Sequence, residues 1–236
     1  IGSNIWRLNP QTNQITEMTH LRPTVRPKHI PLLLHTVLQG PDGKMWFTYA
    51  FGNLIASLDV KTEEMKIYEM SYSEGIYPHT MRFDRDGQLW FTISYTNQLG
   101  TIDPKTDKIV IYDMPTRNEI QAKAAKPATA MKEVTMQRTG DQVIAAHDEI
   151  TTIPYGIDVT PDGKIWFSQF NNRRIGWFDK QSETFHMVDT PFGGPRRFRA
   201  DSKGNLWIPA YAEGGVYRYE PDTGKFTEFT LPTGPG

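Results

Sequence analysis

The sequence predicts an all-β fold, a β-propeller of four-stranded antiparallel blades, from three observations. A turn containing glycine, followed by an apolar residue, Trp and another apolar residue, occurs four times. The four tryptophans are 44, 76 and 41 residues apart, and two of these spacings match the ~40–45 residues of a propeller blade. After each Trp, turns and segments in which apolar and charged residues alternate follow in the same order. This order indicates four strands in each unit. The tryptophans are Trp46, Trp90, Trp166 and Trp207.

The phrase that opens each unit predicts a β-hairpin. Its clearest copy, residues 161–168, reads Pro-Asp-Gly-Lys-Ile-Trp-Phe-Ser. Glycine adopts the positive φ of a tight turn, and the aromatic and aliphatic residues after it suit a buried strand. A third strand, a turn and a half-exposed fourth strand complete the unit. We therefore expect blades over residues 35–70, 79–114, 155–188 and 196–231.

The beginning of the chain lacks this hairpin. Residues 4–10 and 14–18 are typical of a third and a fourth strand alone, so the sequence contains four full blades and half of another. Because a ring closes to remove its edge strands, we expect the single domain, residues 1–236, to be part of a larger ring. A five-bladed ring closed in an unusual way is the alternative.

The largest departure from the repeat is an insertion at about residues 115–153. Its Ala-rich residues 119–126 favour a short helix, and residues 142–146 favour a strand. The insertion joins the fourth strand of one blade to the first strand of the next. We therefore expect it on the ligand face, as a lid, a docking element or surface decoration.

Composition excludes several classes of function. Lys and Arg number 26 against 27 Asp and Glu, and the basic residues are scattered, so no nucleic-acid partner is expected. No apolar run approaches the ~20 residues of a membrane span. The sequence contains no cysteine, which excludes disulfides, thiolate metal sites and covalently attached c-type haem.

The repeat places three kinds of side chain at one equivalent position in the four blades. This position lies eleven residues before each Trp, at the start of the innermost strand, where side chains converge on the central channel. Equivalent positions are usually identical in a repeat, so this divergence indicates a functional site. The four residues are His35, His79, Tyr155 and Arg196.

A second equivalent position lies three residues after each Trp, at the end of the second strand. We expect it to face the same channel mouth, which adds Tyr49 and Gln169 to Tyr155 and Arg196 as candidate ligand-binding residues. Arginine suits capture of a carboxylate or phosphate, and salt bridges between blades are its alternative role. The residues at this second position are Tyr49, Ile93, Gln169 and Ala210.

The two histidines are candidate catalytic residues. A neutral imidazole titrates near pH 7, so His79 and His35 could each act as a general base. The alternative is a structural histidine that lines the channel and is hydrogen-bonded there.

Several phrases resemble the streptogramin B lyase (virginiamycin B lyase) family of seven-bladed propellers. They are Pro-His-Thr-Met at 78–81, Pro-Tyr-Gly-Ile at 154–157, Ile-Trp-Phe-Ser-Gln at 165–169 and Asn-Arg-Arg-Ile-Gly at 172–176. The resemblance covers nearly the whole chain except the connector at 19–34 and the insertion. It implies a periplasmic or secreted enzyme that opens a cyclic depsipeptide at its ester by elimination. A histidine is the base in that family, and glutamates hold Mg²⁺.

Carried onto this sequence, His79 matches the family's Pro-His position, and His35 matches in register but follows Leu34. The family's glutamate position coincides with the second position above, where none of the four residues is acidic. Mg²⁺ needs oxygen ligands, usually with carboxylate charge. We therefore predict no metal ligand and no cofactor, and Mg²⁺ only if further blades supply carboxylates.

Two functions remain open at this point. The one we favour is a non-catalytic propeller that binds a small polar or anionic ligand, or a protein partner, through the channel face. The alternative is a carbon–oxygen lyase of the streptogramin lyase type, with His79 as base. Carboxylates at the second position of further blades would favour the lyase.

Overall fold

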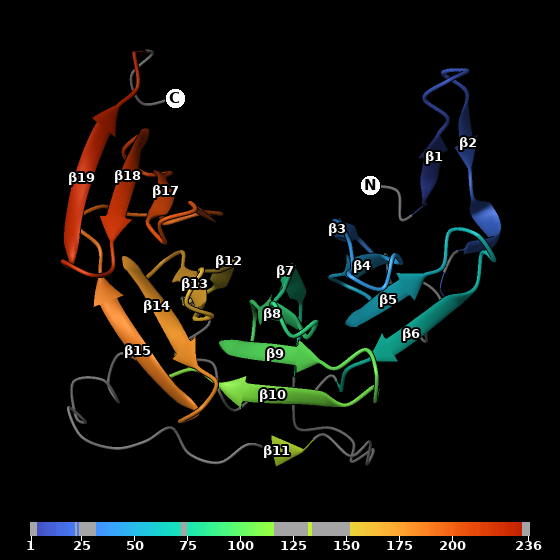
Figure 1. Ribbon diagram of the computed structural model, residues 1–236, viewed down its shortest axis with the longest axis horizontal. Helices are drawn as coiled ribbons and strands as arrows, with labels where there is room; N and C mark the ends of the chain where they lie inside the picture. The colour runs from blue at the N-terminus through green and yellow to red at the C-terminus, as the bar shows by residue number, and fades with distance from the viewer. Residues whose placement is uncertain are drawn as a thin grey trace.

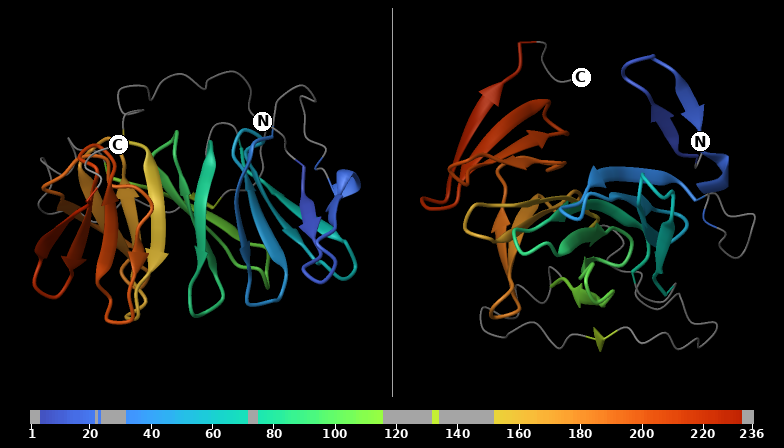
Figure 2. Two further views of the ribbon diagram at one scale, coloured as in Figure 1. Left: turned by 90° about the horizontal axis from the view of Figure 1, so that it is seen from above. Right: turned by 45° about the vertical axis from the view of Figure 1, so that its right-hand side comes forward.

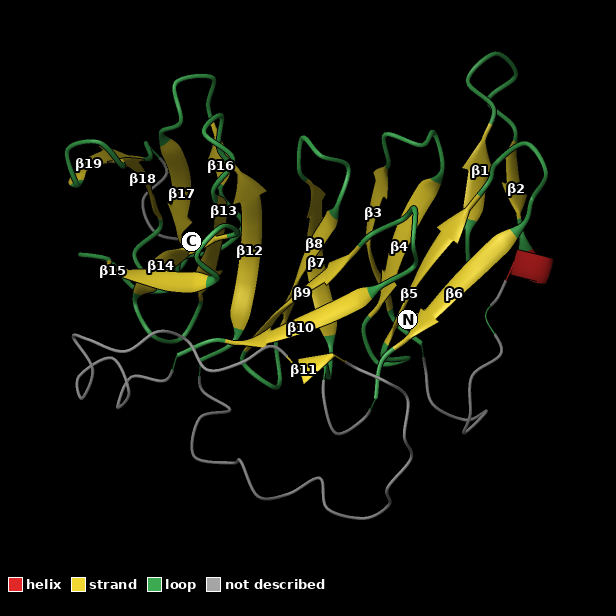
Figure 3. Cartoon of the chain, turned by 60° about the horizontal axis from the view of Figure 1, so that its bottom comes forward, coloured by secondary structure: helices red, strands yellow, loops and turns green. Residues whose placement is uncertain are grey.

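The structure is a computed structural model that describes residues 4–21, 23, 32–71, 75–115, 132–133 and 152–232. Antiparallel sheets follow one another in chain order and form an open arc around a central axis (Figure 1). Their strands stand side by side when the arc is seen from above (Figure 2). Figure 3 shows that this part of the chain is strands and loops, apart from one short helical segment, η1 (Thr19–Leu21).

Four sheets form the blades, and in each one the strands run in sequence order from the axis to the rim. Blade one contains β3 (Leu34–Gln39), β4 (Met45–Tyr49), β5 (Leu54–Leu58) and β6 (Met65–Glu69). Blade two contains β7 (Pro78–Phe83), β8 (Leu89–Ile93), β9 (Gln98–Ile102) and β10 (Ile109–Asp113). Blade three contains β12 (Pro154–Val159), β13 (Ile165–Gln169), β14 (Arg174–Asp179) and β15 (Thr184–Asp189). Blade four contains β16 (Arg199–Ala200), β17 (Leu206–Ala210), β18 (Gly215–Glu220) and β19 (Lys225–Thr230).

A two-stranded sheet precedes blade one. It consists of β1 (Trp6–Leu8) and β2 (Ile15–Glu17), which pair antiparallel as the half-blade prediction requires. Residues after β2 cover one face of blade one, where Met18 and Leu21 pack against Phe47. The all-β propeller prediction and its blade boundaries are thus confirmed.

The insertion contributes one described element, the two-residue strand β11 (Lys132–Glu133). It pairs with β10 and adds a fifth strand to the rim of blade two. The helix expected at 119–126 and the strand expected at 142–146 lie outside the described residues. The placement of the insertion on the ligand face stays a prediction.

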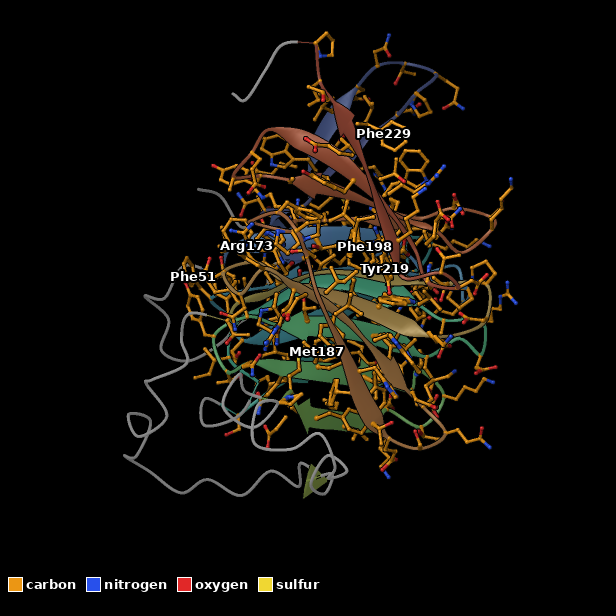
Figure 4. All side chains as sticks on the ribbon, turned by 90° about the vertical axis from the view of Figure 1, so that its left-hand side faces the viewer. Phe51, Arg173, Met187, Phe198, Tyr219 and Phe229 are labelled. Atoms are coloured by element: carbon orange, nitrogen blue, oxygen red, sulfur yellow. The ribbon has the colours of Figure 1, made fainter. Side chains whose placement is uncertain are left out.

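Aromatic side chains fill the space between successive blades. Trp46, Trp90 and Trp166 are almost fully buried, and each packs against the blade that follows its own. Phe198 and Tyr219, labelled in Figure 4, belong to the cluster around Trp166. These large buried surfaces hold neighbouring blades together.

Trp207 departs from this pattern because it is only half-buried. The face of blade four that carries Trp207 packs against no later blade among the described residues. The Trp207 indole lies beside Phe229, with ring centroids 5.2 Å apart. The indole nitrogen still donates to Asp201 Oδ2 at 3.1 Å. The strand after each turn, expected to be buried, therefore has its Trp in the core in three of the four blades.

None of the described helices is long and apolar enough to cross a membrane.

Candidate functional site

The innermost strands of blades one to three each begin with a β-bulge. In blade two, Pro78 pairs with Ile93 and Met81 pairs with Phe91, so two residues of β7 oppose a single residue of β8. The same shift occurs in β3 and in β12. A bulge bends its strand and leaves main-chain groups outside the ladder. The residues at the bulges are the predicted site residues His35, His79 and Tyr155.

In blades one to three, a hydroxyl group on the second strand forms hydrogen bonds with main-chain groups that the bulge leaves outside the ladder. Thr92 Oγ1 accepts a hydrogen bond from the Thr80 amide at 3.3 Å and donates one to the Tyr155 carbonyl of the next blade at 3.0 Å. Thr48 likewise accepts from the Thr36 amide and donates to the His79 carbonyl, both at 2.9 Å. Each hydroxyl thus stabilises its own bulge and positions the site residue of the following blade.

Ser168 repeats this arrangement between blades three and four. Its Oγ accepts from the Gly156 amide at 2.8 Å and donates to the Arg196 carbonyl at 3.1 Å. The backbone of Arg196 is therefore fixed, although it lies before the first regular strand of its blade.

The structure brings three of the predicted side chains into direct contact. The imidazole centroids of His35 and His79 are 4.0 Å apart, and the His79 and Tyr155 rings are 4.2 Å apart. These residues come from successive blades, so their rings form a continuous aromatic row around the axis. His79 is buried, whereas His35 and Tyr155 are partly exposed.

Hydrogen bonds define the tautomer of His79. Its Nδ1 lies 2.9 Å from the Thr80 hydroxyl, which can accept, and 3.2 Å from the Tyr155 carbonyl oxygen, which only accepts, so we assign the proton to Nδ1. Nε2 then presents a lone pair, and none of the described residues donates to it. The pKa of His79 is lowered to about 3. Burial is the largest cause, and the charges of His35, Arg197 and Arg196 lower the pKa further. This imidazole is neutral at physiological pH, and its Nε2 is free to accept a hydrogen bond from a ligand.

Arg197 also joins this group. Its guanidinium donates to His35 Nε2 at 2.8 Å, and it lies 5.5 Å from the centroid of the Tyr155 ring. Because arginine has only donors, His35 Nε2 is unprotonated. Burial is the largest cause that lowers the pKa of His35, and the positive charge of Arg197 is the second. Blades one and four lie on opposite sides of the central axis in Figure 1, so this bond joins two blades that are not neighbours in the arc.

Arg196 lies among aromatic rings. Its guanidinium donates to the Tyr155 hydroxyl at 3.0 Å and is 4.3 Å from the Tyr211 centroid, 5.2 Å from the Tyr155 centroid and 5.8 Å from the Phe170 centroid. Such rings hold a guanidinium by cation–π attraction without neutralising its charge. We call His35, His79, Tyr155, Arg196 and Arg197 the channel-mouth cluster.

Two residues predicted for this site do not join it. Tyr49 is 0% exposed and Gln169 is 1% exposed, and both are buried inside the blades. The Tyr49 hydroxyl has no partner in the described structure, and burial raises its pKa. Gln169 Nε2 donates to Asn97 Oδ1 at 3.3 Å. The expectation that the two side chains face the channel mouth is wrong.

The β-bulge explains the error. In a regular ladder, the residue three positions after Trp would pair with the site residue and share its face. Here Tyr49 pairs with Leu34 and Gln169 with Pro154, each one position before the site residue. Since neighbouring residues of a strand point to opposite faces, Tyr49 and Gln169 point into the blades.

Sequence reasoning also missed residues that the site uses. The hydroxyl of Thr or Ser, two positions after Trp in blades one to three, is a repeated signal that could have been found. Arg197 follows a predicted site residue, but nothing in the sequence shows that its side chain reaches His35. Phe170 and Tyr211 each lie four residues after a signature Trp, in turns of equal length, so the repeat could have placed both rings at one equivalent position.

The described residues do not fit a magnesium ion. No group of three or more His, Asp or Glu side chains within the described ranges could hold a metal. The charged groups that act on the two imidazoles are Arg196 and Arg197, which would repel a cation. No reaction step through Mg²⁺ is therefore assigned to these residues.

Solved structures with a similar fold include a virginiamycin B lyase and a streptogramin B lyase. Virginiamycin B lyase from Staphylococcus aureus is 21% identical, with a TM-score of 0.72 over 98% of this chain and 64% of that chain. A streptogramin B lyase structure is 22% identical, with a TM-score of 0.71 over 98% of this chain and 62% of that chain. This chain has the β-propeller fold of the streptogramin B lyases. The resemblance in fold inferred from the sequence is thus confirmed.

The same propeller fold occurs with other activities. The periplasmic gluconolactonase PpgL from Pseudomonas aeruginosa is 10% identical, with a TM-score of 0.62 over 99% of this chain and 64% of that chain. This chain thus spans less than two thirds of the length of each of these streptogramin lyase-fold and lactonase structures. No protein-family model and no curated protein matches the sequence.

Proposed function

We propose that this streptogramin lyase-like propeller is a binding module for a small anionic ligand, which it holds at the channel-mouth cluster. One observation carries the proposal. Two guanidinium groups, Arg196 and Arg197, meet two neutral imidazoles there, and no carboxylate of a described residue forms an ion pair with either arginine. A carboxylate or phosphate of the ligand would supply the missing negative charge.

The donors and acceptors of the cluster define the ligand further. Arginine binds an oxyanion through two parallel N–H groups. The free lone pair of His79 Nε2 accepts a hydrogen bond, so we expect the ligand to carry a hydroxyl or an amide N–H near its acidic group. The rings of Phe170 and Tyr211 add an apolar wall beside Arg196. A hydroxylated aromatic acid has all three features.

The binding role is favoured over catalysis for two reasons. An imidazole whose pKa is about 3 is a weak base at pH 7. The carboxylates that the lyase resemblance implies for Mg²⁺ are replaced by residues that are buried and not acidic. Export to the periplasm or beyond is part of the proposal and rests on the resemblance alone.

Calorimetric titration tests the proposal. The probe is 4-hydroxybenzoate, and the neutral 4-hydroxybenzamide is its matched control. We expect the acid to bind and the amide to bind at least tenfold more weakly. Arg196→Gln should remove the preference for the acid, whereas Arg7→Gln, an exposed arginine on β1, should leave it unchanged. Equal binding of the acid and the amide would contradict the proposal.

The lyase alternative is tested separately, because a structure of a catalytically inactive virginiamycin B lyase from S. aureus with quinupristin also matches this fold. The protein is incubated with quinupristin and excess Mg²⁺, and the ring-opened isomer is sought by chromatography. We expect no ring opening. A linear product that disappears in His79→Gln would replace the binding role with the lyase.

A further inference from the structure

Three aromatic rings of blades one and two adjoin the channel-mouth cluster. Tyr77 lies two residues before His79, and the rings of these two residues are inclined by only 21°, with centroids 6.1 Å apart. The Tyr77 ring also stacks on Tyr95, with centroids 4.4 Å apart, and meets Phe51 edge to face at 5.3 Å. We call Phe51, Tyr77 and Tyr95 the aromatic shelf.

Two rings of the aromatic shelf are open to solvent. Phe51 is 41% exposed and Tyr95 is 47% exposed, whereas Tyr77, which contacts both, is half-buried. Phe51 and Tyr95 lie in the turns that follow the second strands of their blades, at the end of the blade where the channel mouth lies. Figure 4 shows Phe51 on the same side of the molecule as Arg173, which belongs to the corresponding turn of blade three. Exposed aromatic side chains that gather in this way mark a binding surface.

Main-chain hydrogen bonds hold the two stacked tyrosines in place. The Tyr77 amide donates to Asn53 Oδ1 at 3.0 Å, and the Tyr77 carbonyl accepts from the Ser94 amide at 3.0 Å. The Tyr95 amide donates to the Ile76 carbonyl at 3.2 Å, which keeps the segments before β7 and after β8 side by side. Rings that are already positioned lose little conformational freedom when a ligand binds.

The aromatic shelf carries no charge, but its edge is polar. Burial raises the pKa of Tyr77, and the other groups that raise it are the tyrosines Tyr95 and Tyr155, so no charged side chain of the described residues contributes. The hydroxyl groups of Tyr77 and Tyr95 form no hydrogen bond with a described residue. The shelf therefore suits a neutral part of a ligand.

A sugar ring matches both properties of the aromatic shelf. The C–H groups on one face of a pyranose pack on an aromatic ring, and its hydroxyl groups form hydrogen bonds with polar groups at the edge of that ring. A flat aromatic ring would use the exposed faces of Phe51 and Tyr95 and leave the tyrosine hydroxyl groups to water.

The order of the rings defines where this sugar lies relative to the anionic group of the ligand. His79 contacts both Tyr77 and Tyr155, and Tyr155 accepts a hydrogen bond from Arg196 at 3.0 Å. The aromatic shelf and Arg196 are therefore linked through His79 and Tyr155. A ligand whose carboxylate binds Arg196 and whose hydroxyl group donates to His79 directs that hydroxyl group toward Tyr77.

We propose that the aromatic shelf is a sugar subsite, so that the ligand held at the channel mouth is an O-glycoside of a hydroxylated aromatic acid. The inference rests on the proposed function, because it takes the carboxylate at Arg196 from there. The sugar is attached at the phenolic oxygen and packs on Phe51 and Tyr95. One of its hydroxyl groups donates to His79 Nε2 in place of the phenol.

Calorimetric titration with substituted benzoates tests the sugar subsite. The probe is 4-(β-D-glucopyranosyloxy)benzoate. Its control is 4-methoxybenzoate, which blocks the same oxygen without adding a sugar. We expect the glucoside to bind at least tenfold more tightly than the methyl ether. It should also bind more tightly than 4-benzyloxybenzoate, which places an apolar ring at the same position.

Variants of the aromatic shelf locate the gain. Phe51→Ala and Tyr95→Ala should each reduce the preference for the glucoside over the methyl ether to less than threefold. Both residues are exposed in turns, so we expect both variants to fold. Phe229→Ala removes an equally exposed phenylalanine from β19 and is the matched control, which should keep the full preference.

Three results would overturn the inference. They are equal binding of the glucoside and the methyl ether, tighter binding of 4-benzyloxybenzoate than of the glucoside, and a full preference in both Phe51→Ala and Tyr95→Ala. Comparison with 4-hydroxybenzoate separates this inference from the proposed function. If 4-hydroxybenzoate and its amide bind equally, the anion site and the sugar subsite are both wrong. If the acid is preferred and the glucoside gains nothing, only the sugar subsite is wrong.

Discussion

At the scale of single residues, hydrogen-bond partners distinguish packing from function. Every member of the channel-mouth cluster has a hydrogen bond to a neighbour, and His79 has one ring nitrogen left for a ligand. Tyr49, by contrast, has a buried hydroxyl with no described partner. A buried polar group without a partner lowers stability, so Tyr49 is placed for its ring.

Tyr49→Phe should therefore leave the free energy of unfolding unchanged or raise it by about 1 kcal/mol, because it removes a desolvated hydroxyl that makes no bond. Urea denaturation measures the change. Tyr68→Phe in the same blade is the control, since Tyr68 donates to Asp107 Oδ1 at 3.1 Å and its loss should be destabilising. A loss of 4-hydroxybenzoate binding in Tyr49→Phe would restore Tyr49 to the ligand site.

At the scale of the element, the bulged inner strand decides which residues face the channel. The sequence predicted the equivalent positions of His35, His79, Tyr155 and Arg196 correctly, because each is counted from a Trp in its own hairpin. It failed for Tyr49 and Gln169, because no turn residue or glycine common to the three blades marks the bulge. A one-residue shift in register reverses the face of every later side chain.

The hydroxyl of Thr92 offers a test of this element. Thr92→Val keeps the shape of the side chain but leaves the Thr80 amide without its hydroxyl partner, and the Tyr155 carbonyl keeps only its hydrogen bond from His79. We expect a loss of about 1–3 kcal/mol in the free energy of unfolding. We also expect weaker 4-hydroxybenzoate binding, since Tyr155 would be less well positioned.

The matched control is Thr101→Val on the adjacent strand of the same blade. The Thr101 hydroxyl is buried and has no described partner, so its removal should cost little. Equal destabilisation by the two variants would show that the Thr92 hydrogen bonds do not hold the bulge.

At the scale of the whole molecule, the repeat made the architecture predictable. Four copies of one hairpin predicted four blades. In each later segment, the alternation of apolar and polar residues predicted the remaining strands. The sequence could not show that two blades that are not neighbours in the arc contact each other, since Arg197 and His35 are 162 positions apart. Nor does it show how the inner strands lie against one another, which decides the burial of His79.

Burial of His79 predicts how stability depends on pH. The folded-state pKa is about 3, below the usual value of 6.5. Between these values the unfolded chain binds a proton that the folded protein does not, so stability falls as the pH falls below 6.5. At pH 5 the loss is at most about 2 kcal/mol, from 1.36 kcal/mol per pKa unit.

Urea denaturation at pH 7.5 and pH 5.0 measures this dependence. The loss on acidification should be smaller in His79→Gln, which has no proton to bind at that position. Carboxylates with lowered pKa values, such as Asp201, act mainly below this range and are common to both proteins. An identical loss in wild type and His79→Gln would show that His79 is protonated in the folded state.

The hydroxyl groups that link the blades have a consequence for how binding specificity changes over evolution. Thr48, Thr92 and Ser168 each contact the main-chain carbonyl of a site residue and not its side chain. Every amino acid residue has a main-chain carbonyl that can accept this hydrogen bond. The side chain at a site position can therefore change while the hydrogen bond that holds the blade remains. His, Tyr and Arg already occupy equivalent places in one molecule. Successive duplications of a single blade can in this way produce new combinations of binding groups while the framework stays constant.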